Sequence, residues 1–385
     1  MQNLNVIIAG AGMGGLSAAI ALRQAGHNVH LYERAAELAP IGAAISIWPN
    51  GMKVLHALGV GEAVEAVAGD MRAMSYSTHT GELLTRFSLD PLYRQVRQRA
   101  CPIARAELQR LLLQAAGPEH VTLGVGCEGY TESQEGVSVH LSTGESVQAD
   151  LLIAANGTHS ALRNTVAGER IDRRYCGYVN WNGRIRMDAA LSDRHEWAQF
   201  VGEHKRVSLM PMGTDEFYFF FDVPLPAGTP NVREQYREEL LAHFAGWAQP
   251  VQQLIDRLDP AGIARVEIHD TQRVPHLASQ RVALLGDAAH AMTPNIGQGG
   301  CQAMEDAWVL ARSLEGASSV QAGLQRYEAQ RADRVANLVL KARERAAIIH
   351  GEDETATQAW YAELPGSEEA IIAGLVKTTV GGPLA

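Results

Sequence analysis

The sequence predicts an α/β fold in which a Rossmann-like nucleotide-binding domain is joined by a domain built on an antiparallel sheet and by a long C-terminal helix. Three observations support this fold class. Short apolar runs alternate with helical patterns through about residue 70, which is typical of a parallel sheet with crossover helices. Residues 178–270 instead contain strand-like runs in succession. The chain ends in helical segments, of which 301–314 and 324–349 are long and amphipathic.

The first element is a glycine-rich turn between a strand and a helix. Val6–Ala9 form a short apolar run, and Gly10, Gly12 and Gly15 follow with the spacing GxGxxG. These glycines permit a tight turn, close approach to a pyrophosphate and close helix–strand packing. The helix that follows would direct its free N–H groups at the phosphates. Glu33 ends the next apolar run, 18 residues after Gly15, where a carboxylate can bind an adenosine ribose hydroxyl.

Later elements complete the two predicted domains. After residue 98 we expect a helix at 105–116, strands with turns at 121–150 and a buried strand at 151–155. The second layer would contain strands at 206–210 and 217–223 and a helix at 232–247. A parallel strand then returns at 282–285. Polar, strand-like pieces occupy 72–98. We therefore assign residues 72–98 and 178–270 to a substrate-binding domain. Residues 1–71, 99–177 and 271–385 form the nucleotide-binding domain with the C-terminal helices.

A second glycine-rich segment, Gly286–Gly300, lies far downstream of the first. It supplies another turn that can close on the same ligand. An extended cofactor held from both ends of a 385-residue chain favours FAD over a loosely exchanged NAD.

Composition excludes several classes of function. The net charge is −10 and no Lys/Arg block occurs, so nucleic acid is not an expected partner. The four cysteines are scattered without a CxxC pair, so we expect no metal site and no disulfide framework. No apolar run approaches the length of a membrane span, and the apolar N-terminus lacks the basic lead of a signal peptide, so we expect a cytoplasmic protein. GxSxG and HExxH are absent, so no protein nucleophile or zinc protease site is expected.

Three ordered motifs resemble those of the group A flavoprotein aromatic hydroxylases, which share the fold of p-hydroxybenzoate hydroxylase. They are the glycine turn ending at Glu33, the segment 155–163, and the segment 286–300 followed by 304–307. Asn156 stands in the second motif where the family usually has Asp. The resemblance implies bound FAD, NADH or NADPH as a transient reductant, and O2 that forms a flavin C4a-hydroperoxide.

The same comparison suggests how FAD would be held. Gly12, Met13 and Gly14 would bind the diphosphate through backbone N–H groups, and Glu33 and Arg34 the adenosine end. Other expected cofactor contacts come from small or polar residues later in the chain: Ser46 near the ribityl–diphosphate region, Arg105 at a phosphate, Cys127 at the adenine edge, Asp287 at the ribityl chain, and the backbone of Gly297, Gln298, Gly299, Gly300 and Cys301 at the flavin pyrimidine.

The central region is similar to one branch of this family, the bacterial FAD-dependent urate hydroxylases. The segments 42–51, 177–183, 205–211 and 217–226 carry this likeness. It implies hydroxylation of urate to 5-hydroxyisourate in purine catabolism. Asn295 is a departure, because those hydroxylases can carry Asp there. The expected substrate-binding residues are Asn180, Arg206, Tyr218, Asn295 and Gly297, of which Arg206 and Tyr218 are expected to be catalytic.

Arg206 is the principal substrate candidate because a guanidinium matches the planar edge of an anion such as urate with two parallel bonds. If the hairpin turn centres near Thr214, Arg206 lies opposite Asp222, and Phe220 and Tyr218 share that face. The alternative is that Arg206 and Asp222 form a solvated cross-strand ion pair. His290 is either a general base or, as we favour, a residue that packs beside the flavin or bonds backbone.

Alternatives to urate hydroxylation remain open. Arg206 would equally serve a small aromatic acid such as a hydroxybenzoate or a hydroxynicotinate. A non-catalytic flavin-binding protein of the same fold is a third hypothesis. The late helix can pack internally or form a dimer surface, so a monomer or a homodimer is expected. We interpret its basic residues as a solvated face; they are Arg331, Arg334, Lys341, Arg343 and Arg345.

Overall fold

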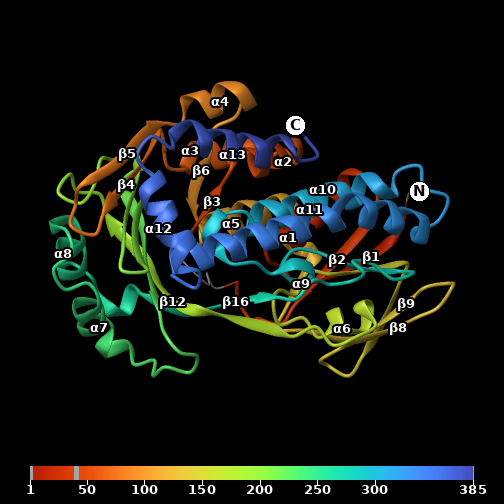
Figure 1. Cartoon of the computed structure of the whole chain (residues 1–385). Helices are drawn as coiled ribbons and strands as arrows, with labels where there is room; N and C mark the ends of the chain where they lie inside the picture. The colour runs from red at the N-terminus through yellow and green to blue at the C-terminus, as the bar shows by residue number, and fades with distance from the viewer. Residues whose placement is uncertain (1–2, 39–42, 385) are drawn as a thin grey trace.

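The computed structural model describes residues 3–38 and 43–384. Gly42, the first residue of one segment similar to the urate hydroxylases, lies outside the described residues. The mixture of helices and strands confirms the predicted α/β class, with two large sheets joined by helices (Figure 1).

A five-stranded parallel sheet forms the nucleotide-binding part of the fold. Its strands lie in the order β17 (Val282–Leu284), β11 (Leu151–Ala154), β1 (Asn5–Ala9), β2 (Asn28–Glu33) and β7 (Val121–Leu123). The helices α1 (Met13–Gln24), α5 (Arg105–Ala116) and α10 (Gly299–Leu314) pack together on it. Because β1 is central and parallel to both neighbours, the turn after it opens at the carboxyl edge of the sheet, where such folds bind nucleotides.

The second sheet has seven strands. In order they are β16 (Ala264–Thr271), β12 (Arg173–Arg186), β15 (Glu216–Pro224), β14 (Lys205–Met212), β13 (Glu196–Gly202), β4 (Ala73–Thr78) and β5 (Leu83–Ser88). All neighbours are antiparallel except β13 and β4, which are parallel. The division of the chain into two domains stays an interpretation, and β12 begins five residues before the boundary placed at 178.

The two faces of this sheet differ in chemistry. Phe219 and Phe221 of β15 are buried with Phe244 in an apolar cluster that includes α7 (Tyr236–His243) and α8 (Gln249–Asp256), at left in Figure 1. These two rings are therefore core residues, as expected. The opposite face carries polar side chains, because successive residues of a strand alternate between faces.

Smaller elements connect the two sheets. A two-stranded sheet pairs β3 (Ala44–Ile47) with β6 (Cys101–Ala104), and a three-stranded sheet contains β8 (Cys127–Glu132), β9 (Val137–Leu141) and β10 (Ser146–Ala149). The remaining helices are α2 (Pro49–Ala57), α3 (Gly61–Val67), α4 (Asp90–Val96), α6 (Leu162–Ala167), α9 (Asp287–His290), α11 (Val320–Ile349), α12 (Glu354–Glu363) and α13 (Glu368–Val380). None of the helices described is both long and apolar enough to span a bilayer.

The long C-terminal helix α11 is confirmed, but its basic residues do not form a solvated face. The Arg331 side chain is 1% exposed and donates to Asp306 Oδ1 and Glu305 Oε2, both at 2.7 Å. Arg343 pairs with the buried Asp270. The sequence pattern showed an amphipathic helix but could not show that buried carboxylates on other elements meet its basic residues.

Candidate functional site

The two glycine-rich turns meet at the N-terminal ends of α1 and α10. A Cβ added to Gly14 would lie 3.2 Å from Ala303 Cβ, and one added to Gly286 would lie 3.0 Å from the same atom. A Cβ added to Gly300 would come within 3.9 Å of Met13 Cε. Segments nearly 300 residues apart thus form one cradle, as the sequence predicted.

The cradle fits a diphosphate. Gly10 has φ +105°, and an added Cβ would lie 2.5 Å from Ala155 O, so only glycine permits this turn. By contrast, no atom of the described residues lies within 4 Å of a Cβ added to Gly12. No side chain of residues 3–38 or 43–384 caps the N-terminus of α1. The first N–H groups of this helix are therefore available to an anion in front of Gly12.

Glu33, predicted to bind the adenosine end of a nucleotide, lies at the end of β2. Glu33 accepts hydrogen bonds from the backbone N–H of Ala11 and of Ala35, both at 2.9 Å, so its carboxylate is held beside the glycine turn. Arg34 is exposed next to it. Burial, with the charge of Glu33 nearby, raises the pKa of the Cys127 thiol to about 12. Glu33, Arg34 and Cys127 therefore lie in one region, as an adenosine site requires, with Cys127 uncharged.

Asp287 is the first residue of α9 and is exposed, with no described residue donating to its carboxylate. Its backbone is fixed by Arg163 of the second motif. The buried Arg163 side chain donates to the carbonyls of Asp287 at 2.8 Å, Ala288 at 2.7 Å and Thr158 at 3.0 Å. The segment 155–163 thus holds the backbone of the segment 286–300 in place, while the Asp287 carboxylate stays available to a ligand.

Asn156 lies directly after β11, beside the first glycine turn. A Cβ added to Gly10 would lie 2.9 Å from Asn156 Cα. Asn156 Oδ1 is buried without a hydrogen-bond partner among the described residues, as is Thr158 Oγ1. Because buried polar atoms are normally paired, two such atoms next to the cradle indicate a place for a polar ligand.

The opposite end of the cradle is formed by Gly297–Cys301. Gly297 has φ +64°, and an added Cβ would lie 2.6 Å from Trp48 Nε1 and 2.9 Å from Ser46 Oγ, which brings Ser46 to this turn. The Gln298 side chain is buried and bonded to Asn50 and Gln302. Burial raises the pKa of Cys301 to about 12. Gln298 and Cys301 can therefore contribute only backbone groups, and no side chain of the described residues caps α10.

Arg206 and Asp222 lie opposite each other on β14 and β15, in the predicted register. Arg206 Nε and Nη2 donate to Asp222 Oδ2 at 3.0 and 2.7 Å, and Asn180 Nδ2 donates to Asp222 Oδ1 at 2.7 Å. The solvated pair considered from the sequence is wrong, because the two side chains are 6% and 0% exposed. A guanidinium has five N–H donors, so three remain on Arg206 after these two bonds. The Phe220 ring lies 4.8 Å from Arg206 Cζ.

Tyr218 and Asn295 contribute further polar groups. Burial raises the pKa of Tyr218, so its phenol is protonated at neutral pH. Asn295 Oδ1 accepts a hydrogen bond of 2.6 Å from the Tyr178 hydroxyl, and Asn295 Nδ2 is buried with no partner in the part of the chain that the structure describes. Sequence reasoning missed Tyr178, although it lies two residues before Asn180 and so on the same face of β12. Arg105 is half-buried at the start of α5, where its charge acts on Tyr218.

His290 lies in a buried ionic network. Its Nε2 is 2.6 Å from Asp306 Oδ2, which also accepts from the Gly286 N–H at 2.9 Å. Although burial alone would raise it, the charges of His290 and Arg331 lower the pKa of Asp306 to about 2. His290 thus bonds the Asp306 carboxylate and not a backbone group. The same carboxylate also holds the turn before Asp287 through the Gly286 N–H.

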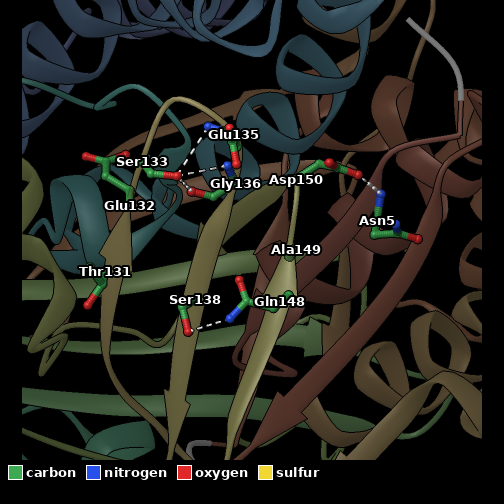
Figure 2. Close-up of a pocket in the computed structure, with 10 residues that line it drawn as sticks. All are labelled: Asn5, Thr131, Glu132, Ser133, Glu135, Gly136, Ser138, Gln148, Ala149 and Asp150. Carbon is green, nitrogen blue, oxygen red and sulfur yellow. Dashed lines mark hydrogen bonds between the residues drawn. The ribbon is translucent and has the colours of Figure 1, made fainter.

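The hollow in Figure 2, about 410 Å³ in volume, lies elsewhere. It is lined by Asn5 of β1, by residues of β8, β9 and β10, and by the loops beside them, such as Glu135 and Asp150. No predicted site residue lines it, and Glu132 at its edge is committed to Ser279 Oγ and the Arg281 N–H.

The FAD binding domain family matches residues 3–342. The chain belongs to this family. It is 51% identical to the FAD-dependent urate hydroxylase of Klebsiella pneumoniae, over 99% of this chain and 100% of that protein. It is 30% identical to the 6-hydroxynicotinate 3-monooxygenase of Pseudomonas fluorescens, covering 88% of this chain and 90% of that protein. The crystal structure of Klebsiella pneumoniae HpxO complexed with FAD and uric acid superposes with a TM-score of 0.97, at 50% identity and covering 99% and 98% of the two chains.

These similarities confirm the flavoprotein hydroxylase resemblance and the prediction of FAD as the cofactor. The arrangement of the cradle fits that cofactor along its length. Glu33 lies at one end, the open Gly12 and the uncapped α1 in the middle, and Asp287 with the Gly297–Cys301 turn at the other. The roles of individual residues stay predictions.

Proposed function

We propose that this protein is an FAD-dependent monooxygenase that uses NAD(P)H and O2 to hydroxylate urate to 5-hydroxyisourate. The observation that carries the proposal is the full-length likeness to a protein crystallised with FAD and uric acid. The polar face around Arg206 agrees with it, since urate is an anion at neutral pH with planar oxygen and nitrogen edges. Bound FAD, once reduced by NAD(P)H, supplies the oxygen-activating chemistry.

The protein's own residues orient the substrate and keep it in place. Two of the three remaining N–H groups of Arg206, one on each terminal nitrogen, are parallel and bind one edge of urate, while Asp222 fixes the guanidinium plane and Asn180 fixes Asp222. Tyr218, protonated, offers a hydroxyl on the same face, and Asn295 Nδ2 offers a further donor. An amide cannot accept a proton, so Asn295 suits a substrate that enters already ionised.

Two groups on the cofactor side support the same chemistry. The N–H groups of Gly297–Cys301, at the start of α10, would bind the flavin pyrimidine, where the helix dipole would stabilise the negative charge of reduced flavin. The Asp287 carboxylate would hold the ribityl chain. We further propose that the enzyme acts in the reducing cytoplasm, as a monomer or homodimer; the cysteines of the described residues, all free, agree with such a compartment.

A second candidate is hydroxylation of a small aromatic acid. The buried Arg206 would bind a carboxylate as well as urate, and one similar protein is a 6-hydroxynicotinate 3-monooxygenase. A substrate screen separates the two. The purified holoprotein is mixed with NADH or NADPH and with urate, 6-hydroxynicotinate or 4-hydroxybenzoate, while NAD(P)H oxidation and substrate loss are followed.

The proposal predicts stimulated NAD(P)H oxidation and substrate loss with urate above the other two compounds. Faster turnover of an aromatic acid would replace urate as the substrate. A protein that binds FAD but oxidises NAD(P)H with none of them would instead support the non-catalytic hypothesis.

A further inference from the structure

The C-terminal end of α11 crosses the polar face of the seven-stranded sheet. His350, just after α11, stacks on Tyr178 of β12 with ring centroids 4.0 Å apart. Near the same end of α11, Arg345 Cζ lies 4.3 Å from the Trp360 ring, which meets Tyr76 of β4 edge-on at 6.3 Å. In the sheet, β15, β14 and β13 lie between β12 and β4. The contacts of Arg345 and His350 therefore bracket the strands that carry Asp222 and Arg206.

Strand register brings Arg345 towards the centre of this face. Tyr76 pairs with Gln199, and Gln199 pairs with Ser208, so these three residues form one row across β4, β13 and β14. Ser208 is two residues from Arg206 on the same face of β14. The Trp360 ring, which contacts both Tyr76 and Arg345, thus links Arg345 to the row next to Arg206.

The charges on this face do not balance. Arg206 and Asp222 neutralise each other. Burial lowers the pKa of His350 to about 4, so this ring is neutral at pH 7. Arg345 is half-buried, and no carboxylate of the described residues lies within ion-pair distance of it. Burial and the charge of Arg206 lower the pKa of Arg345, but a guanidinium stays protonated in proteins. Among the described residues, Arg345 is therefore a cation without a counterion at this face.

We propose that Arg345 is a specificity-determining residue that, together with Arg206, selects the substrate as an anion. A half-buried charge without a counterion is costly, and the substrate's own negative charge removes that cost when it binds. A neutral ring of similar shape gains the stacking and hydrogen bonds but not this compensation. The inference rests on the proposed function, because it names the ionisation state in which urate is recognised.

The test compares a charged with an uncharged purine in the holoenzyme. The dissociation constants of urate and of hypoxanthine, which is uncharged at pH 7, are measured by flavin absorbance changes and by competition. Arg345→Gln should raise the urate constant about 10-fold or more while changing the hypoxanthine constant less than about 2-fold, because only one ligand carries the charge. Arg345→Lys should restore the urate constant to within about 3-fold of wild type, since the charge returns. Arg326→Gln removes the same charge from an exposed position of α11 and should change neither constant.

Equal weakening of both purines in Arg345→Gln would overturn the inference, because a merely structural role through Trp360 affects both alike. An unchanged urate constant would overturn it as well. If Arg345→Gln fails to retain FAD, Arg345→Lys decides: a preference for urate near that of wild type supports the inference, and a 10-fold loss of that preference refutes it. If wild type neither binds nor turns over urate, the proposed function fails instead.

Discussion

Arg206→Gln tests whether the buried guanidinium serves the substrate or only its partner Asp222. The substitution keeps side-chain length and some hydrogen bonding but removes the charge. Asp222, which is 0% exposed, would keep only the 2.7 Å bond from Asn180. Breaking a buried ion pair by removing one partner costs about 3–5 kcal/mol of folding stability. We therefore expect the denaturant midpoint of the holoprotein to fall clearly.

The effect on substrate binding is separate and smaller. Losing a charge-assisted hydrogen bond costs about 1.5–3 kcal/mol, which corresponds to roughly 10- to 150-fold weaker urate binding. Poor placement of urate over the flavin should also lower the ratio of hydroxylated product to NAD(P)H consumed. The two effects are separated by the double variant Arg206→Gln with Asp222→Asn, which removes the uncompensated carboxylate. It should recover much of the lost stability but none of the lost affinity.

The assay measures urate affinity by flavin absorbance, coupling by product per NAD(P)H, and stability by denaturant titration of each variant. Wild-type affinity and coupling in Arg206→Gln would show that Arg206 is only the structural partner of Asp222. A double variant that regains affinity along with stability would show that the binding loss was a folding defect.

Three further predictions concern the cofactor and the buried histidines. Gly12→Val should lose bound flavin, because its side chain fills the space in front of α1, and an unaltered flavin spectrum would contradict the cradle. Asp287→Ala should weaken flavin retention more than His290→Ala impairs hydroxylation, since Asp287 has a free carboxylate and His290 is bonded to Asp306; a His290→Ala enzyme with full FAD and no hydroxylation would make His290 catalytic. His350 has a pKa lowered by burial to about 4, so below about pH 6.5 the unfolded chain takes up the proton first and stability falls towards pH 4. His350→Asn should flatten this decline in acid denaturation curves, and an unchanged slope would exclude His350 as its source.

Much of the fold could be predicted because its signals are local. The spacing of Gly10, Gly12 and Gly15, the apolar runs beside them and Glu33 define a strand–turn–helix–strand unit within one stretch of chain. The hairpin register that places Arg206 opposite Asp222 likewise follows from one turn and the two-residue period of strands. The helix at 105–116 was predicted with the bounds that the structure has.

The parts that sequence reasoning missed depend on contacts between distant segments. Arg331 and Arg343 look like exposed basic residues of an amphipathic helix, but buried carboxylates at Asp306 and Asp270 meet them in the fold. The burial of the Arg206–Asp222 pair arises because other elements cover the sheet face, which periodicity within the hairpin does not reveal. Arg345 was likewise interpreted as an exposed basic residue, because its neighbours Trp360 and Tyr76 come from the distant elements α12 and β4.

The most direct test of the account is to run the reaction under oxygen-18-labelled O2 with the purified holoenzyme, NAD(P)H and urate. Mass spectrometry of the product gives the origin of the new hydroxyl. A flavin monooxygenase acting on urate predicts one labelled oxygen atom in 5-hydroxyisourate and about one NAD(P)H oxidised per urate consumed. Label that enters only from water, or NAD(P)H oxidation that yields peroxide while urate stays intact, would contradict the proposed function.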